Sequence, residues 1–183
     1  MKIVGLAYKK GVGKNTTAKF MTTVLRCENP GLKIKEISFA GKLKDICYQL
    51  YSWAGLKRGI YYESHREEKE VVLPLIGKSP RQIWIEVGNK LRKVDPDIWI
   101  NFALKGVKAD IIIITDVRFR NEAQAIRDNR GRLLRIDRPD MPLGTDPAEV
   151  DLDSWTDWDC IINNTGTLQE LNAQAEMLAR GLL

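Results

Sequence analysis

The sequence predicts a three-layer α/β fold with a mostly parallel central sheet. Short apolar segments alternate along the chain with segments of helical periodicity. Residues 109–115 include four consecutive isoleucines, which is typical of a strand buried on both faces of a parallel sheet. The first apolar segment runs directly into a turn rich in glycine and lysine. In such folds ligands bind beyond the carboxyl ends of the strands.

The chain opens with a predicted strand, loop, helix and second strand. Residues 2–7 form a short apolar run, and residues 16–25 repeat apolar side chains at helical spacing. Residues 34–39 are predicted to form a strand. Residues 40–53 are predicted to form an amphipathic helix, with these side chains facing inward: Leu43, Ile46, Cys47 and Leu50.

The middle of the chain changes character. Residues 57–78 lose the periodicity and include a polar run at 63–69, which indicates a mobile segment. Ser79 followed by Pro80 predicts a helix start, because serine caps a helix and proline fits its first turn. This helix is expected to continue through residue 92, and a second one to follow over residues 95–103.

The remaining elements complete the alternation. The strand at 109–115 is expected to end at Asp116, followed by a helix over 121–128 and a strand over 131–136. Residues 141–156 are rich in Pro, Asp and Gly and are predicted to form a loop. The last strand and helix are expected at 160–162 and 166–178, and the helix faces inward through Leu168, Leu171, Ala175 and Leu178.

Length and composition favour one soluble domain. The chain has 183 residues, 44% hydrophobic and 29% charged, and a net charge of +5 that favours polyanionic ligands. Its three widely spaced cysteines are interpreted as buried thiols in a reducing compartment. The sequence shows no signal segment and no membrane-spanning stretch, so a cytoplasmic location without membrane contact is predicted.

The turn after the first strand has the chemistry of a phosphate-binding loop. Such a loop needs glycines that let backbone N–H groups converge, a lysine and a helix start, and Gly11, Gly13 and Lys14 provide them. Tyr8 stands where the common pattern has its first glycine, and Asn15 where it has a hydroxyl residue. The alternative is a surface turn without a ligand.

Three charged residues follow the isoleucine-rich strand. Asp116 is placed to hold Mg²⁺ through water, with Thr16 as the second predicted metal ligand; alternatively Asp116 only caps the next turn. Arg118 and Arg120 would neutralise charge that develops during phosphoryl transfer. Positive charge opposes the dipole of the helix that begins there, which favours a functional role for the arginines.

Taken together, several segments resemble the deoxynucleoside monophosphate kinases of tailed bacteriophages, whose loop has the spacing Gly-x-Gly-Lys-x-Thr. The resemblance covers nearly the whole chain and rests on residues 9–18, 38–44, 79–82, 97–99, 116–122, 135–139 and 162–168. It implies a P-loop kinase fold, transfer of phosphate from ATP with Mg²⁺ to deoxynucleoside monophosphates, and a location in the host cytoplasm if the chain is phage-encoded. Homodimers are frequent among such kinases.

The resemblance also implies roles for individual residues. The catalytic residues would be Lys14, Asp116, Arg118 and Arg120. The ATP-binding residues would be Lys10, Gly11, Val12, Gly13, Lys14, Asn15, Thr16, Thr17 and, near adenine, Arg138. Residues 57–105 would form a mobile insertion that binds the acceptor, and the acceptor pocket would include Phe39, Ala40, Lys44, Arg81, Trp84, Arg92 and Trp99. Trp84 and Trp99 would either stack on a base or belong to the core.

One departure keeps the acceptor open. These kinases commonly carry Gly-Thr-Glu where this chain has Gly-Asn-Lys at residues 88–90. A first alternative is a kinase for hydroxymethylated pyrimidines within DNA, for which the scattered lysines would suit a DNA backbone. A second is a nucleotide-binding regulator that does not catalyse.

Overall fold

The computed structural model describes residues 1–141, 144 and 146–182. The chain divides into two compact units. The first unit contains Met1–Ser38 and the chain from Gly106 onward, and the second unit contains Phe39–Lys105. The predicted phosphate loop therefore belongs to the first unit, and the predicted acceptor residues belong to the second.

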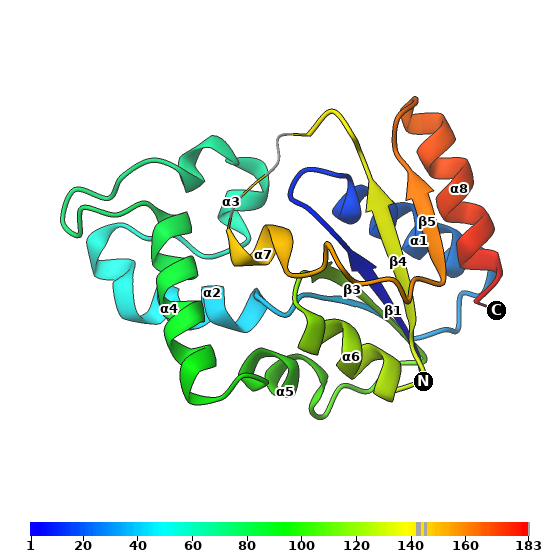
Figure 1. Cartoon of the computed structure of the whole chain (residues 1–183), viewed down its shortest axis with the longest axis horizontal. Helices are drawn as coiled ribbons and strands as arrows, with labels where there is room; N and C mark the ends of the chain where they lie inside the picture. Colours follow the sequence, from blue (N-terminus) through cyan, green and yellow to red (C-terminus); the bar gives the residue numbers. More distant parts are fainter. Residues whose placement is uncertain (142–143, 145, 183) are drawn as a thin grey trace. The chain divides into compact units, whose positions relative to one another are not determined.

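The first unit is built on a parallel sheet, which confirms the predicted fold class (Figure 1). Among the described residues the sheet has five strands in the order β2-β3-β1-β4-β5. Their bounds are β1 Lys2–Ala7, β2 Ile34–Ile37, β3 Ile111–Val117, β4 Arg132–Asp137 and β5 Cys160–Asn163. The pairing of β1 with β3 is irregular between Gly5 and Ala7, just before the predicted phosphate loop.

Helices cover both faces of this sheet, as the three-layer prediction requires (Figure 1). On one face α1 (Lys14–Glu28) and α8 (Leu168–Arg180) share a buried core with Val4 and Leu6 of β1. On the other face lies α6 (Arg120–Asp128), whose Ile126 packs so closely on Gly5 that a Cβ there would be 2.5 Å from its Cδ1 atom. Burial on both faces explains the isoleucine run of β3.

The second unit is helical. It contains α2 (Gly41–Tyr51), the 3₁₀ turn η1 (Ser52–Ala54), α3 (Tyr61–Ser64), the 3₁₀ turn η2 (Glu67–Lys69), α4 (Pro80–Val94) and α5 (Ile98–Leu104). The predicted start of α4 is confirmed, because Ser79 and Gln82 form a reciprocal capping box with Pro80 in the first turn. Residues 57–78 were expected to lack regular structure, but α3, η2 and a bridge between Leu73 and Lys78 lie there.

Several predicted details are wrong. β3 continues to Val117, so Asp116 lies within the strand instead of after it. The predicted loop at 141–156 contains α7 (Pro147–Val150), because Asp146 caps a turn that begins with a proline.

Three predicted inward-facing or buried side chains are instead exposed. Leu50 and Leu168 are 54% and 64% exposed, because both lie in the terminal turns of their helices, beyond the packed stripe. The thiol of Cys27, near the end of α1, is exposed as well.

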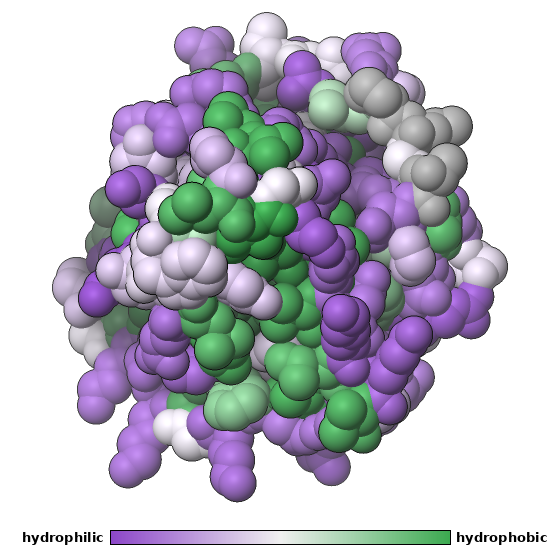
Figure 2. Space-filling view, turned by 90° about the vertical axis from the view of Figure 1, so that its left-hand side faces the viewer, coloured by the Kyte–Doolittle hydropathy of each residue, from purple (hydrophilic) through white to green (hydrophobic). Residues whose placement is uncertain are grey.

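Apolar residues also reach the surface. Figure 2 shows a face on which hydrophobic residues gather between hydrophilic ones. Among the described residues, most of the exposed large apolar side chains belong to the second unit: Leu50, Trp53, Ile60, Val71, Val72, Leu75, Ile85, Val94 and Phe102. None of the described helices has the length and apolar character needed to cross a membrane. The expected homodimer stays a prediction.

Candidate phosphate-binding site

The backbone of residues 8–13 forms a tight loop between β1 and α1. Gly11 and Gly13 have φ of 82° and 108°, which L-residues with a side chain rarely adopt. Space also excludes side chains, because a Cβ on Gly13 would lie 2.7 Å from the Nδ2 atom of Asn164. That same amide donates a hydrogen bond of 2.9 Å to the carbonyl oxygen of Val12 and so holds the loop from outside. Asn164 belongs to residues 162–168, which contribute to the family resemblance, but the sequence predicted no role for it.

Lys14 begins α1 and is buried beneath the loop. Its ammonium group donates hydrogen bonds to the carbonyl oxygens of Tyr8, at 2.7 Å, and Lys9. Burial lowers the pKa of Lys14 to about 7, and the charge of Arg118 adds to this effect, whereas Glu149 and Asp116 oppose it. An anion bound at the loop would favour the charged form of this lysine.

The residues after Lys14 differ in exposure. Thr17 is fully buried, and its hydroxyl donates to the carbonyl oxygen of Gly13 at 3.1 Å, so it supports the first turn of α1. Thr16 is partly buried, and Asn15 is exposed. Of these three predicted donor-site residues, Thr17 thus has a structural contact that fixes the loop, while Asn15 and Thr16 lie nearer the surface.

Tyr8 takes the conformation that the missing glycine would have. Its φ is 94°, an unfavourable value for a residue with a bulky side chain. The guanidinium of Arg135 lies 4.0 Å from the centre of its ring, and the ammonium of Lys9 lies 5.1 Å from it. Cation–π contacts of this kind offset part of the backbone cost. Tyr8 therefore anchors the start of the loop to β4.

The end of β3 brings two further charged groups toward the loop. Lys14 starts α1 after β1, and Asp116 and Arg118 lie at the end of the neighbouring strand β3 and just after it, so all three belong to the carboxyl edge of the sheet. The charges of Asp116 and Arg118 change the pKa of Lys14 in opposite directions. The turn after β3 is fixed by the buried carboxylate of Glu122, which accepts from the backbone N–H groups of Arg118 and Phe119 at 2.9 and 3.2 Å. Sequence reasoning did not single out Glu122.

Arg120, the fourth predicted catalytic residue, is exposed and contacts a different partner. Its guanidinium donates to the carbonyl oxygen of Asp151, at 3.1 Å, and to the hydroxyl of Ser154. Its backbone N–H donates to the carboxylate of Asp151 at 2.6 Å. Arg120 thus contacts residues 146–154. We call these residues the acidic segment, after Glu149, Asp151 and Asp153.

Arg138, expected near the adenine of ATP, lies just after β4 and is exposed. Its carbonyl oxygen accepts a hydrogen bond of 3.2 Å from the N–H of Met141. Its position at the carboxyl edge of the sheet matches the edge at which the loop lies.

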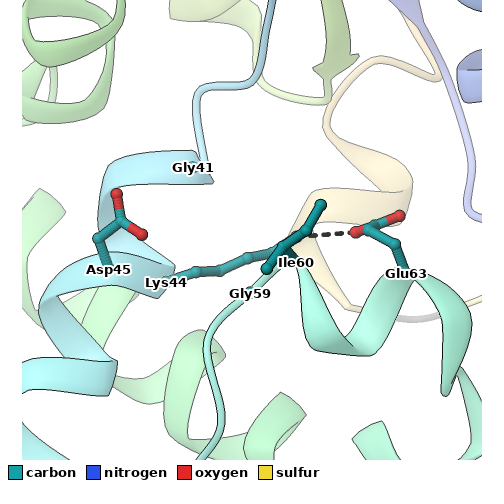
Figure 3. A pocket seen from close by; sticks show the side chains of 6 residues that line it. All are labelled: Gly41, Lys44, Asp45, Gly59, Ile60 and Glu63. Atoms are coloured by element: carbon teal, nitrogen blue, oxygen red, sulfur yellow. Dashed lines mark ion pairs between the residues drawn. The ribbon is translucent and has the colours of Figure 1, made fainter.

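A separate pocket of about 230 Å³ lies within the second unit (Figure 3). Gly41, Lys44 and Asp45 of α2 line one side, and Gly59, Ile60 and Glu63 line the other. The ammonium of Lys44 lies 3.7 Å from the carboxylate of Glu63, which also lies 4.0 Å from the ammonium of Lys69. Lys44 is therefore the predicted acceptor residue that the structure places in a pocket.

Lys69 was missed by sequence reasoning, which assigned it only to a polar run. Burial lowers the pKa of Lys69, and the nearby charges of Lys44, Arg81 and Arg66 lower it further, against the effect of Glu63. Arg81 forms an ion pair with Glu70. Positive groups from α2, η2 and α4 thus lie near one another in this unit.

The other predicted acceptor residues have mixed positions. Phe39, Trp84 and Trp99 are buried, which favours the core alternative for the two tryptophans. The ring of Trp84 packs edge to face on Tyr62, and the ammonium of Lys44 lies 5.5 Å from its centre. Neither indole N–H has a hydrogen-bond partner among the described residues. The remaining two are Ala40, which directly precedes α2, and Arg92, which lies in the last turn of α4.

Comparison with known proteins adds one relative. No protein-family model matches the chain. A protein of Acanthamoeba polyphaga mimivirus, named "Putative deoxynucleotide monophosphate kinase", is 28% identical over 191 aligned positions. The alignment covers 95% of this chain and 94% of the viral protein, so the similarity includes both units.

Proposed function

We propose that this protein is a kinase that transfers the terminal phosphoryl group of ATP, with Mg²⁺, to deoxynucleoside monophosphates. The observation that carries the proposal is the buried Lys14 at the end of a glycine loop. The charges of Asp116 and Arg118 lie near enough to change the pKa of this lysine. The name of the mimivirus relative supports the same class of reaction and acceptor. The resemblance of the sequence to phage kinases is in line with it.

The reaction joins an oxygen of the acceptor monophosphate to the terminal phosphorus of ATP. The bond between that phosphorus and the bridging oxygen breaks, and ADP leaves with the electron pair. The protein's task is to position the groups and to stabilise negative charge. Lys14 and the N–H groups of the loop would bind the donor phosphates, and Arg118 would neutralise the transferred group.

The residues at the loop fit Mg²⁺ as the metal. Mg²⁺ keeps several waters and binds through one or two carboxylates plus the phosphates of the substrate, and a carboxylate and a hydroxyl are oxygen donors of the kind it prefers. Asp116 and Thr16 are the proposed protein contacts. When bound, the metal would neutralise charge on the donor phosphates.

The pocket of the second unit is the proposed acceptor site. Lys44, with Lys69 and Arg81 nearby, provides positive charge for a monophosphate dianion. The carboxylate of Glu63 balances part of this charge in the unliganded protein. Which base is accepted depends on contacts beyond this charged group.

The test is transfer of label from [γ-³²P]ATP with Mg²⁺ to each deoxynucleoside monophosphate, and in parallel to duplex DNA with hydroxymethylated pyrimidines. Label in a deoxynucleoside diphosphate supports the proposal and identifies the base. Label only in modified DNA would replace it by the DNA-kinase alternative. ATP binding without any transfer would favour the regulatory alternative.

A pair of variants tests the donor site itself. Lys14→Ala should lower turnover about 100-fold or more, because it removes a positive charge from the transferred phosphates. The matched control is Lys19→Ala, which removes an exposed lysine from the same helix and should keep full turnover. Equal turnover in both variants would refute the assignment of the loop.

A further inference from the structure

The acidic segment, residues 146–154, contacts several groups that would bind or neutralise phosphate in the proposed function. Three of its four acids, Glu149, Asp151 and Asp153, lie at alternate positions, and each contacts a different part of the site. Glu149 contacts Lys10 and Arg118, Asp151 contacts Arg120, and Asp153 contacts Lys9. All of these residues belong to the first unit.

Glu149 occupies the central position. One oxygen of its carboxylate accepts a hydrogen bond of 2.7 Å from the backbone N–H of Lys10, within the phosphate loop. The other forms an ion pair with the guanidinium of Arg118. The side chain is only 13% exposed. A loop N–H and an arginine are the donors by which proteins hold a phosphate oxygen.

We propose that Glu149 occupies an anion site of the phosphate loop in the unliganded protein and that the acidic segment leaves when a polyphosphate binds. A phosphate and the carboxylate need the same two donors, so they compete for them. Leaving the carboxylate beside a bound phosphate would place like charges in contact at a partly buried site, which is costly. This inference rests on the phosphate-binding part of the proposed function and needs neither its acceptor nor its catalysis.

The contacts of Asp153 with Lys9 and of Asp151 with Arg120 attach the acidic segment on either side of Glu149. Lys9 and Asp153 pair at 2.9 Å, and the Lys9 side chain is 9% exposed whereas that of Asp153 is 45% exposed. Asp151 accepts from the exposed backbone N–H of Arg120. Asp153 and the N–H of Arg120 are accessible to water, which can replace these two contacts when a multiply charged anion displaces the segment. In the absence of such an anion the contacts keep the segment over the loop.

The first experiment measures binding of inorganic tripolyphosphate by titration calorimetry. This probe carries the phosphates of ATP without a nucleoside, so its binding does not depend on kinase activity. Glu149→Gln removes the competing charge and should bind the probe about tenfold more tightly than the unchanged protein, or about 1.4 kcal/mol. Glu36→Gln is the matched control, because it removes an exposed acid of β2 and should leave the affinity unchanged.

The outcomes separate this inference from the proposed function. Equal or weaker binding by Glu149→Gln, or no binding by either protein, would overturn it. Tighter binding without transfer from ATP to any acceptor would keep the inference and refute the kinase.

Hydrogen exchange in the unchanged protein gives a second test that needs no variant. Tripolyphosphate should slow exchange of the amides in residues 8–17, because the ligand covers them. It should accelerate exchange in the acidic segment, because that segment leaves. Slower exchange in both regions would mean that the acidic segment closes over the ligand, and the inference would be wrong.

Discussion

Two residues of the predicted phosphate loop are held in unfavourable states. Lys14 is buried although it can carry a charge, and Tyr8 has a left-handed backbone although it is not glycine. Neighbouring groups offset both. The ammonium of Lys14 donates hydrogen bonds to two carbonyl oxygens, and the ring of Tyr8 forms a cation–π contact with Arg135. Unfavourable local states tend to persist at sites whose function needs them.

The buried lysine predicts a pH dependence of stability. The pKa of Lys14 is about 7 in the folded protein against 10.5 ordinarily, so between these values the unfolded state binds more protons. The contribution of Lys14 to the free energy of unfolding should therefore rise with pH across this window, by at most about 1.4 kcal/mol per pH unit. Urea unfolding of the unchanged protein and Lys14→Met at pH 7 and 9 measures it. A difference between the two proteins that does not change with pH would contradict the burial of this group.

Tyr8 predicts a difference between two substitutions. Tyr8→Ala loses the ring contact with Arg135 but keeps the strained φ of 94°, whereas Tyr8→Gly loses the contact and relieves the strain. Glycine usually destabilises a folded protein relative to alanine, but at a positive φ it avoids the steric cost that alanine bears. Tyr8→Gly should therefore be more stable than Tyr8→Ala by about 1 kcal/mol. Chemical denaturation of both variants tests this. Greater stability of Tyr8→Ala would show that the backbone is not strained at this position.

At the scale of single elements, the ends of the helices are encoded locally. Ser79 and Gln82 form a capping box at α4, and Thr167 and Glu170 form one at α8. The pattern of a hydroxyl residue followed three positions later by Glu or Gln lies in the sequence itself. Burial along these helices depends on packing, as Leu168 in the first turn of α8 illustrates by its exposure despite a favourable position in the periodic pattern.

The two caps differ in burial, which predicts unequal costs. Ser79 is 3% exposed, whereas Thr167 is exposed, so water can replace only the threonine cap. Ser79→Ala should destabilise the protein by about 1–2 kcal/mol, and Thr167→Ala by less. Thermal unfolding of both variants compares them. A larger loss for Thr167→Ala would mean that burial does not set the worth of a cap here.

At the scale of the whole molecule, the strand order makes β3, β1 and β4 the interior strands of the sheet. β3 lies between β2 and β1, β1 between β3 and β4, and β4 between β1 and β5. Residues Ile112–Ile114 have no exposed side-chain surface. Their amides should exchange with deuterium only through global unfolding, whereas those of α7 and the edge strand β5 should exchange faster. Residue-resolved exchange measures this order, and early exchange in β3 would contradict the strand order.

The sequence by itself determined the order of the main strands and helices, and it predicts a phosphate-binding chemistry for the loop. Continuous apolar runs mark β1 and β3, Ser79 with Pro80 marks the start of α4, and helical periodicity marks α8, because burial and helix caps leave local signals in a sequence. Glycine and lysine at residues 11, 13 and 14 mark the loop, because few other residues permit its backbone and its charge. These are properties of neighbouring residues, which a single sequence records.

Only the tertiary structure decided which distant residues meet at the loop. Glu149 lies 139 positions from Lys10 and contacts its N–H, and Asn164 lies 152 positions from Val12 and holds its carbonyl oxygen. The sequence assigned the acidic segment to a loop, because prolines, glycines and acids at residues 141–156 indicate only the absence of long regular structure. Contacts across such separations follow from strand order and helix placement, which the spacing of residues does not encode.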